Sequence, residues 1–392
     1  TEFKAQDTRQ SAVKSPQATG GDSITAECQN NGRKLAMSNE PKLLVTGSGG
    51  VIGGNVIDYA VRSGISVRGV SRRRPSEAPK GWEHISADLL DPTATSEAFH
   101  EVADTTRLVF GAYIEEQEPR RQIETNLALL ENTLDGLKSV KAPLEHVTLY
   151  QGMKFYGAHL GDFKTPAYED DPRLVVPNFY YDQEDLLRKR AKADGFNLTI
   201  FRPEGVMGYA KGTPMNLLMV IAAYVTIVKE LGLPLRFPGP KHVYDHVLYQ
   251  MSDAELLAEA TIWAGGEPQA HGEAFNLTNG DTIRWRHLFE AIADHYGLST
   301  AEPQKFDLAE QMPQYSELWD EIVSKYGLEP TPWSTLVDWN FGDMILNSDF
   351  DNVSSTIKVR KAGFPGCHDT IDRTLELLDQ LAERKIIPPA GK

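Results

Sequence analysis

Residues 42–54 read KLLVTGSGGVIGG, and this stretch decides the fold. Its first five residues form a short apolar run that is typical of a buried β-strand. Gly47, Gly50 and Gly53 follow at once with G-x-x-G-x-x-G spacing, and apolar residues then recur at helical spacing over 56–61. Such a strand, turn and helix bring backbone N–H groups and the positive end of a helix to a bound phosphate. A plain tight turn without a ligand is the alternative, but the position of the three glycines between a strand and a helix favours a dinucleotide site.

The next predicted strand, 66–70, runs into the basic turn Ser71-Arg72-Arg73. Sites specific for NAD place an acidic residue here, which accepts a hydrogen bond from the ribose 2′-OH. This turn instead offers a hydroxyl and two guanidinium groups, which pair well with a 2′-phosphate. The alternative is a solvated turn without a ligand. The residues favour NADP(H) over NAD.

Strands and helices alternate through the first half of the chain. Strands are predicted at 84–87, 108–111, 145–149 and 198–201, and a helix at 124–137. This rhythm implies a parallel sheet with right-handed crossovers. We therefore predict an α/β protein with a Rossmann-type, doubly wound sheet, in which Asp88 lies where such folds hold the adenine edge.

The regular alternation fades in the second half. Helices are predicted at 216–230, 253–263, 285–296 and 371–382, with a short strand at 273–276. This mixture predicts a smaller C-terminal substrate lobe that is interwoven with the sheet. The expected organisation is a disordered tail or added extension over 1–40, with Met37 as the natural start, an NADP(H)-binding domain over 41–205, and a mainly substrate-binding lobe over 206–392.

The composition disfavours several classes of function. The 392 residues carry a formal net charge of −15, which argues against nucleic acid or an anionic membrane as the main partner. No apolar run reaches the roughly 18 residues that span a bilayer. Cys28 and Cys367 form no disulfide framework, so a reducing, cytoplasmic location is expected. His242 and His246 fall short of the three converging ligands of a metal site, so no metal is expected. The oligomeric state is open, with a homodimer as one option.

Short-chain dehydrogenases/reductases carry a tyrosine and, four residues later, a lysine on one helix face. Tyr150 and Lys154 match this spacing, but the match begins at the end of a strand and is interrupted by Gly152. We therefore reject Tyr150 as the helical tyrosine. The usual place is the start of the following helix, where Tyr180 and Tyr181 stand and an acidic residue occupies the lysine position after each.

This displaced arrangement resembles one family. Residues 178–185, NFYYDQED, resemble the N-F-Y-Y-x-x-E-D signature of the progesterone 5β-reductase and iridoid synthase family, a group of extended short-chain dehydrogenases/reductases. The resemblance covers about residues 42–388. Further similar segments are Ser71–Arg73, Gly152–Tyr156 (G-x-K-x-Y), Arg202–Gly208 (R-P-G-x-I-x-G), Ala274–Asp281 and Trp339–Leu346.

The resemblance implies that Lys154 and Tyr180, brought together from two loops, are the catalytic groups. It implies NADPH-dependent 1,4-reduction of a carbon–carbon double bond in an enone or enal. Hydride reaches the β-carbon, Tyr180 donates a hydrogen bond to the enolate oxygen, and Lys154 supplies positive charge nearby. The alternative without a catalytic role is that Lys154 is an exposed loop lysine and that Tyr180 and Tyr181 only pack against other residues.

The remaining site residues follow from the motifs and the resemblance. Glu204 departs from the family's glycine, and Tyr113 stands where plant members tend to carry tryptophan, so the substrate does not carry over. Packing in the core is an equal alternative for the substrate residues. The expected substrate residues are Tyr113, Phe155, Tyr156, Met207 and Phe341. The expected cofactor residues are Gly47, Gly50, Val51, Ile52, Gly53, Ser71, Arg72, Arg73, Asp88, Leu89, Gly111, Ala112, Lys154, Tyr180, Pro203, Gly205 and Val206.

Three other functions stay open on the same scaffold. A carbonyl (1,2) reductase would use the same cofactor and the same hydrogen-bond donors. A nucleotide-sugar epimerase or dehydratase is disfavoured by the missing helical Tyr-x-x-x-Lys and by the arginines of the cofactor turn. A non-enzymatic NADP(H) sensor would need neither Lys154 nor Tyr180.

Overall fold

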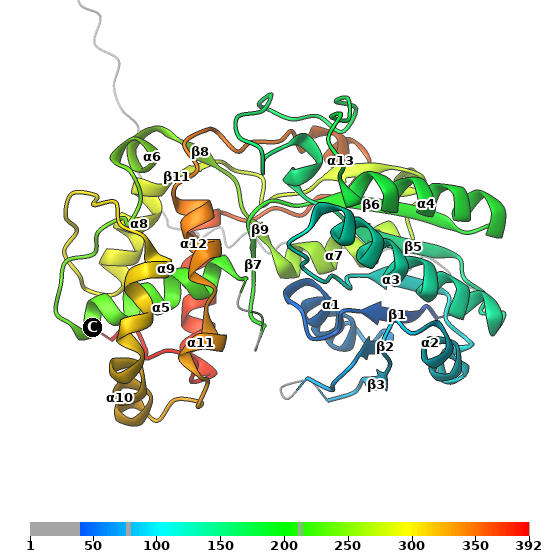
Figure 1. Ribbon diagram of the computed structural model, residues 1–392, viewed down its shortest axis with the longest axis horizontal. Coiled ribbons are helices and arrows are strands. Elements are labelled where there is room, and N and C mark those ends of the chain that lie inside the picture. The colour runs from blue at the N-terminus through cyan, green and yellow to red at the C-terminus, as the bar shows by residue number, and fades with distance from the viewer. Residues whose placement is uncertain (1–39, 76–79, 211–212, 214, 392) are drawn as a thin grey trace, which may run out of the picture. The chain divides into compact units, whose positions relative to one another are not determined.

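The computed structural model describes residues 40–75, 80–210, 213 and 215–391 (Figure 1). The expectations for the N-terminal tail and for Met37 lie outside these residues.

A parallel sheet of seven strands forms the centre of the first half, in the order β10-β6-β5-β4-β1-β2-β3. β1 pairs with β2 on one side and with β4 on the other, so the strand order reverses at β1. This confirms the predicted α/β fold with a Rossmann-type sheet. The strands are β1 (Lys42–Thr46), β2 (Ser66–Ser71), β3 (Glu83–Ser86), β4 (Arg107–Phe110), β5 (His146–Tyr150), β6 (Asn197–Arg202) and β10 (Ala274–Asn276).

Both faces of the sheet are covered by helices, which explains why the three middle residues of β1, Leu43–Val45, are all apolar. Successive residues of a strand point to opposite faces. Val45 packs with α1 and α7 on one face, whereas Leu44 packs in a second cluster with residues of α3 and α4, and both are fully buried. The covering helices are α1 (Val51–Arg62), α2 (Pro92–Ala98), α3 (Pro119–Ser139), α4 (Phe179–Asp194) and α7 (Ala254–Ala264), together with the 3₁₀ turn η1 (Phe99–Val102).

Helix α3 begins five residues before the predicted start at Glu124. The reason is local, because the Glu118 carboxylate accepts hydrogen bonds from the N–H groups of Arg120 and Arg121. Pro119 occupies the first helical position, where its missing N–H needs no partner. The sequence feature that marks the start of this helix is therefore the pair Glu118-Pro119, and not the spacing of the apolar residues.

The second half packs around α5 (Leu217–Glu230), whose residues from Leu217 to Val228 are all buried. It also sends β10 back into the large sheet beside β6, so the two halves are interwoven as expected. Among the described helices, none combines the length and the apolar character that crossing a bilayer requires.

Several short elements of this half were not predicted, because such short segments carry little periodicity. Two small sheets pair β7 (Val206–Met207) with β9 (Ser252–Asp253) and β8 (Leu248–Tyr249) with β11 (Ile283–Arg284). The short helices α6 (Lys241–His246), α9 (Leu308–Gln311), α11 (Trp333–Leu336) and α13 (Ile357–Lys361) and the 3₁₀ turns η3 (Pro268–Ala270) and η4 (Met312–Tyr315) belong to this group. The longer helices α10 (Ser316–Tyr326) and α12 (Trp339–Leu346) were not predicted either, whereas α8 (Trp285–His295) and α14 (Thr370–Glu383) lie where helices were predicted.

Candidate active site

The residues expected to bind the cofactor follow the carboxyl ends of the parallel strands. Because these ends meet at one edge of the sheet, segments far apart in the sequence converge there. The glycine turn follows β1, the basic turn follows β2, Asp88 follows β3, Gly111 follows β4, Lys154 follows β5 and Pro203 follows β6.

Two glycines of the G-x-x-G-x-x-G segment, Gly47 and Gly53, are packed so closely that a side chain has no room there. Gly47 has a positive φ of 67°, and a Cβ there would lie 2.4 Å from the carbonyl oxygen of Gly111. A Cβ at Gly53 would lie 2.3 Å from the carbonyl oxygen of Gly47. The Thr46 hydroxyl also accepts hydrogen bonds from the N–H groups of Gly111 and Ala112, each at 3.2 Å. The loops after β1 and β4 are thus held against each other.

The N-terminus of α1 suits a bound pyrophosphate. No side chain among the described residues caps this helix, and its first turn contains no acidic residue. By contrast, α2 and α3 are each capped by a carboxylate. The N–H groups of Val51, Ile52 and Gly53 have no acceptor within the helix, since the first turn of any helix leaves such donors unpaired. An anion at this position would accept from them.

The basic turn after β2 has a fixed backbone and exposed cations. The Ser71 hydroxyl accepts from Ser48 at 2.9 Å and donates to the carbonyl oxygen of Arg73 at 2.8 Å. Ser86 donates to the carbonyl oxygen of Arg72 at 3.2 Å. Both guanidinium-bearing side chains are exposed, so they are free to face a 2′-phosphate.

Beside this turn, the carboxylate of Asp88 accepts a hydrogen bond from the N–H of Leu90 at 3.1 Å. The Asp88 residue is exposed, whereas Leu89 is buried. The loop after β3 therefore presents a carboxylate at the same edge of the sheet.

One side chain joins the segments that carry Lys154 and Tyr180. Asn178 precedes α4, and its side-chain oxygen accepts from the N–H of Tyr180 at 3.1 Å, as expected for a helix cap. Its side-chain nitrogen donates to the carbonyl oxygen of Lys154 at 2.7 Å. The Tyr181 hydroxyl adds a bond to the carbonyl oxygen of Phe155 at 2.7 Å. The 3₁₀ turn η2 (Met153–Tyr156) is thereby tied to the start of α4.

The Tyr180 hydroxyl lies beside the backbone that follows β5. A Cβ at Gly152 would lie 3.3 Å from this hydroxyl and 3.5 Å from the carbonyl oxygen of Pro203. Burial raises the pKa of Tyr180 above its ordinary value, and the negative charges of Glu204 and Glu115 raise it further. Tyr180 therefore keeps its proton at neutral pH and can act as a hydrogen-bond donor.

Tyr113, one of the five expected substrate residues, is linked to Tyr180 by a row of aromatic rings. The ring centroids of Tyr113 and Phe179 are 5.7 Å apart, and those of Phe179 and Tyr180 are 4.3 Å apart. Tyr113 is 39% exposed, so its ring can meet a ligand. Its hydroxyl donates to Glu115.

The other four expected substrate residues are buried or half-buried against other residues of the protein. Phe155 is buried, and the guanidinium carbon of Arg202 lies 3.3 Å from its ring centroid. The buried Tyr156 donates to Asn276 at 2.6 Å. Met207 is buried, and Phe341 is half-buried in α12, and both pack in the core around α5.

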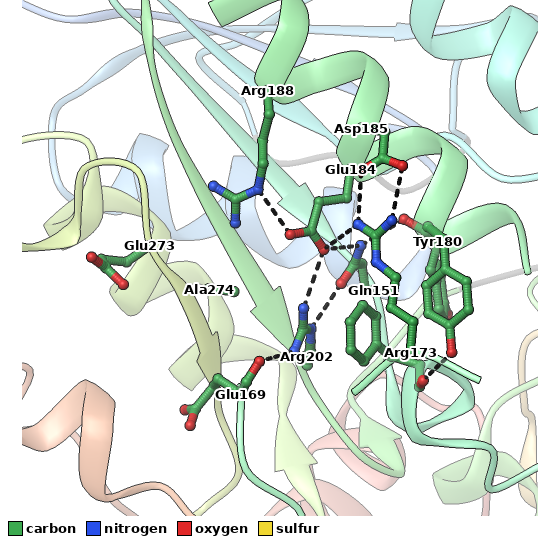
Figure 2. A network of polar contacts seen from close by, with 12 residues as sticks. Gln151, Glu169, Arg173, Tyr180, Glu184, Asp185, Arg188, Arg202, Glu273 and Ala274 are labelled. Carbon is green, nitrogen blue, oxygen red and sulfur yellow. Dashed lines mark hydrogen bonds and ion pairs between the residues drawn. The ribbon is translucent and has the colours of Figure 1, made fainter. Parts of the chain in front are cut away.

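A buried network of polar side chains supports the start of α4 (Figure 2). Arg202, which is 1% exposed, donates to the side-chain oxygen of Gln151 at 2.8 Å and to Glu184 at 3.1 Å. Gln151 in turn donates to the carbonyl oxygen of Tyr180 at 2.9 Å. Burial acts to raise the pKa of Glu184, but the positive charges of Arg202 and Arg188 outweigh it, and this pKa is lowered.

The role of this network was not predicted. Glu184 is the acidic residue that occupies the position of the expected helical lysine, four residues after Tyr180. The usual lysine at this position is a cation, whereas Glu184 is an anion. Its negative charge is compensated by the cation Arg202 at the end of β6. Glu184 and Arg202 each lie in a segment that the sequence analysis singled out, 178–185 and 202–208. Nothing in the sequence indicates that the two side chains pair.

The outer side of this network is closed by the segment before α4. Arg173 donates to both carboxylate oxygens of Asp185, at 2.8 and 2.9 Å, as the dashed lines of Figure 2 show. Such a bidentate pair restrains the segment between Lys154 and Tyr180.

Tyr150 has a different environment from Tyr180. It is buried at the end of β5, and its hydroxyl hydrogen-bonds to Thr261 of α7 on one face of the sheet. This placement agrees with the rejection of Tyr150 as the donor to a substrate.

Known proteins resemble the chain over almost all of the described residues. The PRISE-like Rossmann-fold domain family matches residues 84–388. An (S)-8-oxocitronellyl enol synthase of Camptotheca acuminata is 32% identical, over 88% of this chain and 93% of that protein. A 3-oxo-Delta(4,5)-steroid 5-beta-reductase of Arabidopsis thaliana is 30% identical, over 90% of this chain and 95% of that protein.

Solved structures support the fold. A short-chain dehydrogenase/reductase superfamily protein of Agrobacterium tumefaciens with bound NAD superposes with a TM-score of 0.60 at 17% identity, covering 88% of this chain and 99% of that one. The UDP-glucose 4-epimerase of Thermus thermophilus in complex with NAD gives 0.59 at 17% identity, covering 86% and 98%. At this identity the likeness concerns the architecture alone.

Proposed function

Because the chain belongs to the PRISE-like family of Rossmann-fold oxidoreductases, we propose that it uses NADPH to reduce an activated carbon–carbon double bond. The substrate class is an enone or enal, in which the double bond is conjugated to a carbonyl group. The observation that carries this proposal is the joining of the Lys154 turn to the start of α4 by Asn178, at the edge of the sheet where the cofactor motifs converge. A nicotinamide cofactor is consistent with the NAD-bound structures that share the fold.

The cofactor would be held by groups along this edge. The first turn of α1 suits the pyrophosphate, and Arg72 and Arg73 suit the 2′-phosphate. Asp88 and Leu89 stand at the expected adenine position. The loop Gly111–Ala112 and the segment Pro203–Val206 lie after β4 and β6, on the way to the nicotinamide.

The protein's own contribution is to stabilise negative charge on the substrate. When bound, NADPH supplies a hydride for the β-carbon. Tyr180 donates a hydrogen bond to the carbonyl oxygen, on which the enolate charge builds, and Lys154 places a positive charge nearby. The α-carbon then takes a proton from solvent, so that one hydride and one proton are added across the double bond.

The first test is an assay with a small cyclic enone, in which NADPH consumption is followed and the product is identified. The saturated ketone is expected. An unsaturated alcohol would instead show carbonyl (1,2) reduction on the same scaffold. If NADPH binds but neither enones, enals nor ketones are consumed, the proposal fails and a sensing role gains support.

Cofactor choice gives a second prediction. The double substitution Arg72→Ala, Arg73→Ala is expected to raise the KM for NADPH by about 100-fold or more, because each charged hydrogen bond to a phosphate contributes about 1.5–3 kcal/mol and the variant loses two of them. The KM for NADH should stay nearly constant, since NADH lacks the 2′-phosphate.

The matched control for this prediction is Arg62→Ala. Arg62 is an exposed arginine in the last turn of α1, where it pairs with Asp58 and Glu255. It lies at the opposite end of the helix from the phosphate site, so both KM values should be unchanged. Equal losses for NADPH and NADH in the double variant would contradict the assignment of the turn to the 2′-phosphate.

A further inference from the structure

Glu204 is a buried carboxylic acid beside the candidate active site, in a position that the proposed chemistry does not use. It is 8% exposed and follows β6 by two residues. The hydroxyl of Tyr249 donates to its carboxylate at 2.6 Å, and the side chain of Asn352 makes a further hydrogen bond to it. Its backbone N–H donates to Ser252 at 3.0 Å.

Glu204 lies within electrostatic reach of Tyr180. The Tyr180 hydroxyl and the carbonyl oxygen of Pro203, the residue before Glu204, lie within 3.5 Å of one point, the place of a Cβ on Gly152. The negative charge of Glu204 also raises the pKa of Tyr180. An anion that forms on an oxygen bound to Tyr180 is therefore subject to the charge of this carboxyl group as well.

The surroundings of Glu204 oppose its ionisation. Burial raises the pKa of Glu204 to about 7, and the hydrogen bonds from Tyr249, the backbone of Gly205 and Asn352 lower it only in part. The carboxyl group is hydrogen-bonded to the side chains of Tyr249 and Asn352, and the Ser252 hydroxyl accepts from the Glu204 backbone N–H; none of these partners is a cation. Both protonation states are thus populated near neutral pH.

We propose that Glu204 is a positioning residue whose protonation sets the rate of hydride transfer, with the neutral acid as the active form. This inference rests on the proposed function. The enolate carries negative charge, and the nearby Glu204 carboxyl group is itself buried, so a carboxylate at this position repels the enolate more strongly than it would in water. A neutral Glu204 removes that repulsion and leaves the hydrogen bond from Tyr180 at full strength.

The test compares the pH dependence of kcat/KM in the wild type and in Glu204→Gln, a neutral side chain of the same shape. The wild-type value is expected to fall about tenfold per pH unit above a pH of about 7. Glu204→Gln should keep a level profile across this range and should exceed the wild type above pH ~8. The same alkaline fall in Glu204→Gln, or a loss of activity at every pH with folding and NADPH binding intact, would overturn the inference.

A matched control uses another carboxyl group with a raised pKa. Burial raises the pKa of Glu259 in α7, which interacts with His368 and Glu255. If Glu204 is responsible for the alkaline fall, Glu259→Gln keeps the wild-type profile. A level profile in Glu259→Gln as well would show that the effect is not specific to Glu204.

A second readout needs no activity, so it separates failure of this inference from failure of the proposed function. The pKa of Glu204 is raised in the folded protein above its ordinary value of 4.5. The folded state then holds a proton that the unfolded state has lost, so wild-type stability falls as pH rises from about 4.5 to about 7. The melting temperature of Glu204→Gln minus that of the wild type should therefore grow over this range and level off above it. A constant difference would overturn the inference even if no substrate were found.

Discussion

Replacing Tyr180 by phenylalanine is expected to lower kcat for an enone by about 10²–10³, the usual effect of losing one preorganised donor to an oxyanion. Phenylalanine keeps the ring that packs 4.3 Å from the ring of Phe179, and it leaves the backbone bonds to Asn178 and Gln151 in place. Because Tyr180 is also an expected cofactor residue, the affinity for NADPH should fall by no more than about tenfold, the contribution of one hydrogen bond. Single-turnover kinetics and a fluorescence titration with NADPH measure the two quantities separately.

The neighbouring tyrosine provides the matched control. Tyr181 donates to the carbonyl oxygen of Phe155 at 2.7 Å and accepts from the N–H of Leu174 at 3.1 Å, so its hydroxyl has structural partners. Tyr181→Phe is expected to lower the free energy of unfolding by about 1 kcal/mol. Its kcat should stay within about tenfold of the wild type. Equal losses of kcat in both variants would argue against Tyr180 as the donor to the substrate oxygen.

Replacing Arg202 by methionine is expected to lower the free energy of unfolding by about 3–5 kcal/mol. The side chains of Arg202 and Glu184 are 2% and 8% exposed, so removal of the cation leaves a carboxylate with little access to water. The donors to Gln151 and Tyr156 are lost as well. Denaturant unfolding at neutral pH measures the change.

Arg188→Met is the control, because the same carboxylate accepts from Arg188 at 2.8 Å while that side chain is 39% exposed. Its loss is expected to reduce stability by about 1 kcal/mol or less, since solvent screens an exposed pair. The double variant Arg202→Met, Glu184→Gln should recover part of the loss, because no buried charge is then left without its partner. Equal costs for Arg202→Met and Arg188→Met would show that burial is not the source of the effect.

The sheet strands were predicted within one or two residues of their observed bounds. The central strands read as apolar runs because they are buried on both faces, so their signal is complete within four to six residues, whereas β3 (Glu83–Ser86) at the edge of the sheet has a single buried residue. The cap of α4 is also a local feature, since the Asn178 side chain accepts from the N–H two residues later. The same side chain also contacts the carbonyl oxygen of Lys154, 24 positions away, and no local pattern indicates that bond.

The environments of the predicted substrate residues could not be predicted from the sequence. Tyr113, Phe155 and Tyr156 are all aromatic and all follow a strand of the sheet. The fold leaves the ring of Tyr113 exposed beside Phe179, but it buries Phe155 beneath Arg202 and Tyr156 against Asn276. Residue type and spacing do not distinguish these outcomes, because each depends on a neighbour from another element.

The sequence by itself determined the strands of the large sheet, the glycine turn, the basic turn and the separation of Lys154 from the helix that carries Tyr180. These features depend on backbone preferences and side-chain patterns within a few residues. Only the tertiary structure decided that Glu184 pairs with Arg202, 18 positions away, and that Glu204 is buried against Tyr249, 45 positions away. The charge state of a carboxyl group depends on the water and the charges around it, and those surroundings exist only after distant segments have packed together.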